Sequence, residues 1–256
     1  MAMTRLQSEW QRLFLPHLPS GAVAADTQLS LIDPMGRVRA LVLTLGRPAD
    51  WDAVSALWQA LQVEWALPAP AIAVNGLDGY QLWFSLTEPV PVAEARDFLD
   101  ALRRRHWPHL APARITLWPE AQGDTVRHAD RVPAQQADRA EGADRAEGDQ
   151  WSAFVAPDLA PMFAETPWLD IPPSPDGQAD LLSQVRSIPP DAWQATLTRL
   201  RAAPQAPADA TRDAVMPDEA QAPRRFLLGV MNDSTVALAL RIEAAKALLA
   251  HTPPCP

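Results

Sequence analysis

The sequence predicts an α+β protein with a front domain of split β-α-β-β-α-β order, as in RRM and ferredoxin-like domains, and a mainly helical C-terminal half. Three observations predict it. Short stretches of the first half alternate or run apolar, as strands do. Two longer stretches between them carry apolar side chains at helical spacing. A low-complexity segment then separates the front domain from the rest of the chain.

The front domain begins with a strand, a helix and a second strand. Residues 37–45 alternate and then run apolar, which predicts a strand. Across 50–65 apolar side chains recur every three or four residues, which predicts a helix with Asp50 near its start. Residues 71–74 form a short apolar run that predicts the second strand, and 75–79 have the asparagine and glycines of a turn.

A third strand, a second helix and a last strand complete the order. Residues 80–86 are rich in aromatic side chains and predict a strand. Pro89 and Pro91 then precede apolar residues at helical spacing, which predicts a helix. Residues 114–118 predict a final short strand that ends at Pro119.

Period-two alternation assigns the residues of each strand to one of two sheet faces. Both helices of a split order cover the same face, so we expect the other face to be open. The residues expected to face the helices are Leu41, Leu43, Leu45, Tyr80, Leu82, Phe84, Ile115 and Leu117. Those expected on the open face are Val42, Thr44, Gln81, Trp83, Ser85, Arg114, Thr116 and Trp118. The open face is therefore predicted to be the more polar one, with two tryptophans.

Composition predicts two linkers. The tandem repeat Ala-Asp-Arg-Ala-Glu-Gly at 137–148 has no apolar side chain larger than alanine, so it cannot bury enough surface to offset the entropy of ordering. A second stretch is rich in alanine, proline and aspartate. The predicted division is a front domain 1–129, a disordered linker 130–150, a Pro-rich helical segment 151–202, a linker 203–223 and a C-terminal helical pair 224–256.

Bulk properties exclude several classes of function. The net charge of -9 argues against a strongly basic protein that coats DNA. A single cysteine, Cys255, excludes a disulfide framework and a cysteine-based zinc site. No apolar run approaches the roughly 18 residues of a membrane span, so we expect no membrane partner and a cytoplasmic location. No cofactor is expected, and His106, His109 and His128 lack the further ligands that a metal site needs.

One part of the front domain resembles a known family. Residues 75–86 read Asn-Gly-Leu-Asp-Gly-Tyr-Gln-Leu-Trp-Phe-Ser-Leu, and 88–95 read Glu-Pro-Val-Pro-Val-Ala-Glu-Ala. This turn, aromatic strand and proline-led helix resemble archaeo-eukaryotic primase-polymerase domains, and the resemblance covers about residues 37–120. That family has two acids at the end of the first strand and one on a later strand, which hold two divalent metals. It also has a histidine on the third strand that contacts the incoming nucleotide.

The resemblance implies that this catalytic machinery has been lost. The family's acids fall at Thr44, Gly46 and Thr116, and its histidine falls at Gln81. Threonine and glycine cannot replace carboxylates as ligands of hard metal ions. We therefore expect a degenerate domain that has no catalytic residues, is not an enzyme, and binds nucleic acid in a replication or mobile-element context.

Aromatic and cationic side chains are the candidates for contacts with single-stranded nucleic acid. They are Trp83, Trp118, Arg37, Arg39, Arg114, Arg103, Arg104 and Arg105. A plainer interpretation is that the N-terminal helix or the middle segment covers the open face and buries the tryptophans. The arginines at 103–105 would then only complement the C-terminal end of their helix.

Two other functions remain open. Residues 225–234 and 240–249 resemble a segment of phage terminase small subunits, and residues 224–251 would then dock a protein partner. This makes a protein-interaction module the alternative function. An active nucleotidyltransferase with rebuilt metal ligands is the third hypothesis. The middle segment is similar to a bacterial family to which no function is attached, so it adds nothing.

Overall fold

The computed structural model describes residues 3–16, 30–122, 125–136 and 150–202. These residues lie within one compact unit, Met1–Ala203, and have the predicted α+β architecture. The helices are α1 (Arg5–Leu13), α2 (Trp51–Val63), α3 (Val92–His106), α4 (Pro175–Ser183) and α5 (Pro190–Ala202), with short 3-10 turns η1 (Pro112–Arg114) and η2 (Ala160–Phe163). The strands are β1 (Arg37–Gly46), β2 (Ala71–Val74), β3 (Gly79–Pro91), β4 (Ile115–Trp118), β5 (Glu120–Gln122), β6 (Thr125–Arg127), β7 (Ala134–Gln135) and β8 (Trp151–Val155). The predicted helical pair at 224–256 lies outside the described residues.

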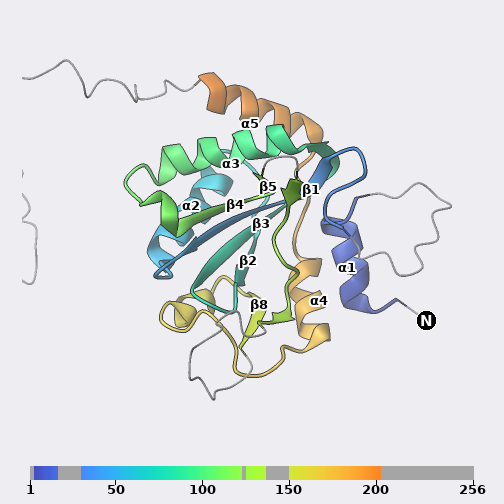
Figure 1. The fold of residues 1–256 in the computed structure, drawn as a ribbon, viewed down its shortest axis with the longest axis vertical. Coiled ribbons are helices and arrows are strands. Elements are labelled where there is room, and N and C mark those ends of the chain that lie inside the picture. The colour runs from blue at the N-terminus through green and yellow to red at the C-terminus, as the bar shows by residue number, and fades with distance from the viewer. Residues whose placement is uncertain (1–2, 17–29, 123–124, 137–149, 203–256) are drawn as a thin grey trace, which may run out of the picture. The chain divides into compact units, whose positions relative to one another are not determined.

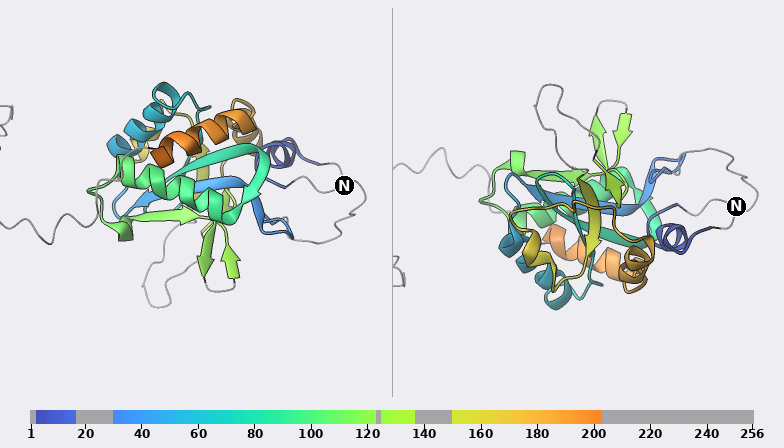
Figure 2. Two further views of the ribbon diagram at one scale, coloured as in Figure 1. Left: turned by 90° about the horizontal axis from the view of Figure 1, so that it is seen from above. Right: turned by 90° about the horizontal axis from the view of Figure 1, so that it is seen from below.

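A curved sheet crosses the described unit (Figure 1). Its strand order is β4-β1-β3-β2-β8-β7, and each neighbouring pair is antiparallel. The separate β5–β6 hairpin projects on the side away from α2 and α5 (Figure 2). None of the described helices is both long enough and apolar enough to cross a bilayer.

Local sequence explains where the helices begin. The carboxylate of Asp50 caps α2 by accepting a hydrogen bond from the Ala53 amide at 3.0 Å. At α1, Thr4 and Gln7 form a reciprocal capping box. α3 follows β3 directly after Pro91, because proline fixes a backbone angle suited to a helix start and needs no amide partner there.

The helix-covered face of the sheet agrees with the predicted alternation. Leu41, Leu43, Leu45, Tyr80, Leu82, Phe84 and Leu117 lie in one core with the apolar sides of α2, α3 and α5, and Ile115 packs against it. α3 and α5 pack next to each other on this face. The strict period of two explains why the alternation assigned these residues to the correct face.

The opposite face is not open along its whole length, which corrects the prediction for Trp83. This side chain is fully buried in a second core. Its indole meets the rings of Trp10 and Phe14 from the α1 segment at centroid distances of 5.4 and 5.3 Å, and that of Phe154 from β8 at 6.0 Å. The physical reason is the apolar surface that Trp83 and its neighbour Val42 would otherwise expose.

The sheet is also wider than the four strands that the sequence predicts. β8 lies in the segment predicted to be helical and pairs with β2, and β7 lies at the start of the predicted linker. β7 is so short that it leaves the outer edge of Phe154 uncovered. The buried Gln178 of α4 fills this gap, because its amide bonds to both the backbone N–H and the backbone C=O of Phe154, at 2.7 and 3.0 Å. Most of the predicted linker, 137–149, lies outside the described residues.

A buried arginine fixes α1 against the sheet, which corrects the prediction that Arg39 contacts nucleic acid. Arg39 is 2% exposed, and it donates to the carbonyl oxygens of Arg12, Leu15 and Leu86 at 3.0, 2.8 and 3.0 Å. Burial lowers the pKa of its guanidinium, which nevertheless stays charged. Carbonyls at a helix C-terminus lack intrahelical donors and carry partial negative charge. The guanidinium supplies both the missing hydrogen-bond donors and a compensating positive charge.

Replacing Arg39 with methionine keeps most of the apolar stem and removes all the donors. We expect Arg39→Met to lower the free energy of unfolding by about 2–4 kcal/mol, because three enclosed carbonyls lose their partner. Arg37 is the matched control, since it is half-buried and, within the described residues, its side chain donates to the carbonyl of Pro89 alone. Arg37→Met should cost about 1 kcal/mol. Urea denaturation measures both, and equal losses would contradict the role of Arg39.

Candidate functional site

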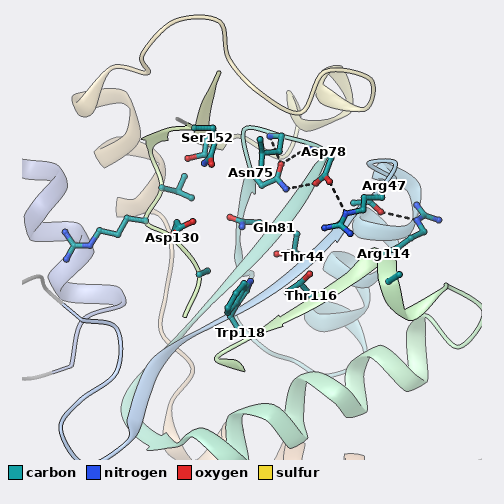
Figure 3. A pocket seen from close by; sticks show the side chains of 17 residues that line it. Thr44, Arg47, Asn75, Asp78, Gln81, Arg114, Thr116, Trp118, Asp130 and Ser152 are labelled. Carbon is teal, nitrogen blue, oxygen red and sulfur yellow. Dashed lines mark hydrogen bonds and ion pairs between the residues drawn. The ribbon is translucent and has the colours of Figure 1, made fainter. Parts of the chain in front are cut away.

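A polar pocket lies on the same sheet face, beside the C-terminal end of β1 (Figure 3). Its volume is about 150 Å³. The lining residues come from the strands, from the turn between β2 and β3, and from the segment after β6. They are Thr44, Gly46, Arg47, Asn75, Leu77, Asp78, Gln81, Ala113, Arg114, Thr116, Trp118, Ala129, Asp130, Arg131, Val132, Gln136 and Ser152.

A row of polar side chains forms the floor of this pocket. The strand register places Thr44 directly opposite Gln81 on β3 and directly opposite Thr116 on β4. Trp118 stands beside this row, two residues after Thr116 on the same face (Figure 3). Together with Gly46, the row contains all four positions at which the resemblance places lost catalytic groups. The structure therefore brings these four sequence-predicted positions together.

The floor has unused hydrogen-bonding capacity. The Thr44 hydroxyl oxygen is shielded from solvent and has no hydrogen-bond partner among the residues that the structure describes. The Trp83 indole N–H donates to Oε1 of Gln81 at 2.9 Å, which fixes the orientation of that amide. Within the described residues, the Gln81 amide nitrogen then has no acceptor, so it remains available to a ligand. An enclosed hydroxyl without a partner is uncommon in proteins, and because solvent does not reach this oxygen, a guest in the pocket does not contact it in this arrangement.

A hydrogen-bonded turn forms one rim of the pocket. The Asn75 side-chain oxygen accepts from the amides of Leu77, Asp78 and Gly79, at 2.9, 2.9 and 3.0 Å. Its amide nitrogen donates to Asp78 Oδ1 at 2.9 Å, and Arg47 contacts Asp78 Oδ2 at 3.2 Å. Asp78 is thus oriented by two neighbours. Arg47 holds its position with a positive φ of 57°, a conformation that only a strongly constrained non-glycine residue keeps.

Close backbone contact between β1 and β3 requires glycine at this rim. A Cβ atom on Gly79 would lie 2.4 Å from the Leu45 carbonyl oxygen, and one on Gly46 would lie 2.8 Å from Asp78 Oδ1. Both distances are shorter than real Cβ contacts. At Gly79 the clash is with the backbone of β1, so the two strands would have to separate, whereas at Gly46 the nearest atom belongs to the Asp78 side chain, which would have to move.

Gly79→Ala should therefore destabilise the fold by about 2–3 kcal/mol, because the Leu45 backbone cannot move away without breaking the pairing of β1 with β3. Gly177 on α4 is the matched control, since the nearest atom to its Cβ would be 3.8 Å away. Gly177→Ala should stabilise by about 0.5–1 kcal/mol through lower entropy of the unfolded chain. Thermal and urea unfolding measure both changes, and the same sign for both would contradict this account.

His128 begins the segment that forms the opposite wall. One ring nitrogen, Nε2, bonds to the Ala40 carbonyl at 2.9 Å, and the other accepts from the Ala129 amide at 2.9 Å. A protonated ring could not accept that second bond. Burial lowers the pKa of His128 to about 4, and the bond to Ala40 offsets this lowering only in part. The neutral ring therefore fixes the wall segment to β1.

This depressed pKa makes stability depend on pH. In the unfolded chain His128 binds a proton below pH of about 6.5. In the folded chain it stays neutral down to about 4, so its contribution is complete above 6.5 and is lost as the pH falls toward 4. Between pH 7.5 and 4.5, wild type should lose about 2–3 kcal/mol more stability than His128→Gln. Denaturation at both pH values measures this difference, and parallel losses would refute it.

The arginines at the end of α3 are engaged elsewhere. Arg103 and Arg104 both contact the Asp100 carboxylate, at 2.9 and 2.5 Å. Arg105 lies over the Trp65 ring with its guanidinium carbon 5.1 Å from the ring centre. None of the three lines the pocket. The plainer interpretation, that they complement the C-terminal end of a helix, agrees with these contacts.

Arg114 is the predicted arginine that does line the pocket. It donates to the carbonyls of Gly46 and Pro48 at 3.1 and 2.9 Å, and lies 3.5 Å from Asp50. It therefore ties η1 to the end of β1 in addition to facing the pocket. Among the predicted nucleic-acid contacts, only Arg114 and Trp118 belong to this site.

Histidines and acids do not form a metal site in the described part of the chain. There, no group of three or more histidine, cysteine, aspartate or glutamate side chains is arranged to hold a metal ion. His106 and His109 line a different cavity, between α2 and the segment after α3. Asp78 and Asp130 do line the polar pocket, but on opposite sides of it (Figure 3).

The sequence did not predict that the turn between β2 and β3, or the segment that begins at His128, would line a pocket. The available signal for the rim was Asn75, whose side chain favours turns that bond back to the backbone. Nothing in the sequence indicates that Asp130 and Ser152 line the same pocket as Thr44, because their positions depend on β8 and on the course of the chain after β6.

Comparison with known proteins does not identify a family for this chain. No protein-family model matches the chain, and a search of curated proteins finds no significant match.

Proposed function

We propose that the chain is a primase-polymerase-like domain that has lost its metal-binding acids and binds single-stranded nucleic acid at the polar pocket. The carrying observation is that Thr44, Gly46, Gln81 and Thr116 line one pocket. The resemblance assigns catalytic roles to these positions. The strand register makes Thr44 the direct neighbour of Gln81 and of Thr116, and Gly46 follows Thr44 by two residues on β1.

The arrangement of strands supports the same descent. A split β-α-β-β-α-β domain is expected to have the strand order β4-β1-β3-β2, with antiparallel neighbours and two connecting helices. The sheet contains this order, and α2 and α3 are the connecting helices. β8 and β7 then extend this unit at its β2 edge.

The chemistry of the pocket favours binding without metal catalysis. Asp78, the carboxylate nearest to the lost positions along the turn, already contacts Arg47 and Asn75. Trp118 supplies a half-exposed aromatic ring, and stacking on such a ring is the usual means of binding a single strand. Salt-dependent affinity is expected because phosphates accompany the bases.

Trp118→Ala should weaken the binding of a twelve-nucleotide thymidine strand about tenfold, because one stacking contact is worth roughly 1–3 kcal/mol. Intrinsic tryptophan fluorescence, titrated with the strand at low and moderate salt, measures this. Trp168→Ala is the control, since that half-buried ring does not line the pocket and bonds to Asp170. Trp83→Ala is unsuitable because Trp83 is a core residue.

Two results would contradict the proposal. One is the absence of quenching by the strand at low salt. The other is equal affinity of wild type and Trp118→Ala. Incorporation of nucleotides with magnesium or manganese would instead favour an active nucleotidyltransferase. Pull-down by residues 224–256 alone would test the interaction module, which lies outside the described residues.

A further inference from the structure

One arginine at the mouth of the polar pocket keeps most of its hydrogen-bonding capacity. Arg47 follows the last residue of β1, lines the pocket, and has 70% of its side chain exposed. Its Nε contacts Asp78 Oδ2 at 3.2 Å, and within the described part of the chain its two terminal nitrogens have no acceptor. A guanidinium carries five N–H donors in a fixed fork, so four of them remain for a ligand.

The neighbours of Arg47 orient this fork. Asp78 holds the Nε side of the guanidinium, and the Asn75 amide nitrogen donates to the other carboxylate oxygen of Asp78 at 2.9 Å. The two terminal nitrogens are thus presented in a defined orientation at the pocket mouth. Parallel N–H groups of this kind match the paired oxygens of a phosphate.

The charges around Arg47 leave room for such a ligand. The side chains of Arg47 and Asp78 are 70% and 43% exposed, and exposed ion pairs of this kind contribute little to stability. Arg114 adds a second guanidinium at the same end of β1, where it bonds to the Gly46 carbonyl and lies 3.5 Å from Asp50. Each guanidinium therefore has one carboxylate neighbour. An anion would be bound by the free donors of Arg47 and not by an excess of positive charge.

The strand register places this fork and Trp118 at opposite ends of the pocket floor. Trp118 lies directly opposite Val42 on β1, and Arg47 is five residues further along that chain. At about 3.3 Å per residue, the two backbone positions are roughly 16 Å apart. The polar row of the floor lies between them (Figure 3). This separation is several times the spacing of about 3.4 Å between successive charges of a stacked strand, so one nucleotide does not reach both ends.

We propose that a single strand crosses the pocket along β1, with one base stacked on Trp118 and the backbone phosphate of another nucleotide bound by the terminal nitrogens of Arg47. This inference rests on the proposed binding of nucleic acid and identifies the group that contacts the backbone. The indole and the guanidinium then have separate tasks, because a base has an aromatic face and a phosphate has charge.

The test compares wild type with Arg47→Gln on two thymidine strands of twelve nucleotides, one with ordinary phosphodiester links and one with uncharged methylphosphonate links. Arg47→Gln should weaken binding of the ordinary strand about fivefold, the size expected of one exposed charge contact. It should also reduce the slope of log affinity against log salt by about 0.7, because one phosphate contact is lost. Its affinity for the uncharged strand should equal that of wild type, whereas Trp118→Ala should weaken binding of both strands.

Arg5→Gln is the matched control. Arg5 forms an exposed pair with Asp180 at 2.6 Å, has a side chain that is 55% exposed, and does not line the pocket. Removing its charge should leave both the affinity and the salt slope unchanged. Urea denaturation should show that both variants are as stable as wild type to within about 1 kcal/mol, because each loses only a surface ion pair.

The outcomes separate this inference from the function on which it rests. Equal affinities of wild type and Arg47→Gln for the ordinary strand, with a loss in Trp118→Ala, would overturn the phosphate contact and leave the proposed function standing. Equal weakening of both strands by Arg47→Gln would also overturn it, because the arginine would then act by shaping the rim. A loss of salt slope in Arg5→Gln as large as in Arg47→Gln would reduce the effect to overall charge. Absence of binding of either strand to wild type would overturn the proposed function itself.

Discussion

The buried guanidinium of Arg39 determines what the second face of the sheet can be used for. Together with the Ser85 hydroxyl, which donates to the Leu13 carbonyl at 2.6 Å, it takes up the carbonyl oxygens at the C-terminal end of α1. This anchors Trp10 and Phe14 over Trp83, and the Trp10 indole donates in turn to the Val132 carbonyl at 2.9 Å. α1 thereby closes one half of the face and also supports the segment that forms a pocket wall. The polar half of the face, around Thr44, is what remains for a ligand.

The division between a covered half and a polar half follows the side chains along each strand. On β1, Ala40 and Val42 lie under α1 and its neighbours, whereas Thr44 lines the pocket. On β3, Trp83 is in the second core and Gln81 lines the pocket. The bond between Trp83 and Gln81 joins the two halves, so the core sets the orientation of a group on the pocket floor. Packing and binding are therefore coupled by neighbouring residues of one strand.

The sequence predicted what depends on local periodicity and missed what depends on distant segments. Alternation placed Leu43 and Leu82 on the helix-covered face, and placed Thr44 and Gln81 together on the other, because a strand has a strict period of two. It gave the covering of Trp83 by the N-terminal helix only as the alternative to an open face, since that docking depends on a guanidinium in a strand and on carbonyls more than twenty residues away. β8 was missed because its five residues adjoin a low-complexity repeat. Arg39 was misassigned because alternation places it on the face of Leu41, whereas a register shift between Val38 and Ala40 interrupts the alternation and the side chain bonds to the carbonyls of the α1 segment.

Two segments lie over the second face, α1 and the stretch from His128 to Val132, and they differ in how they respond to acid. α1 is held by a guanidinium and by backbone carbonyls, none of which changes its charge between neutral and mildly acidic solution. The segment from His128 to Val132 is held by an imidazole that must remain neutral. Acid should therefore open the molecule in sequence, first beside the pocket and only later at α1. A partly opened state of this kind would keep its aromatic core while the pocket lost one wall, so acidification would release a bound ligand before the protein unfolds.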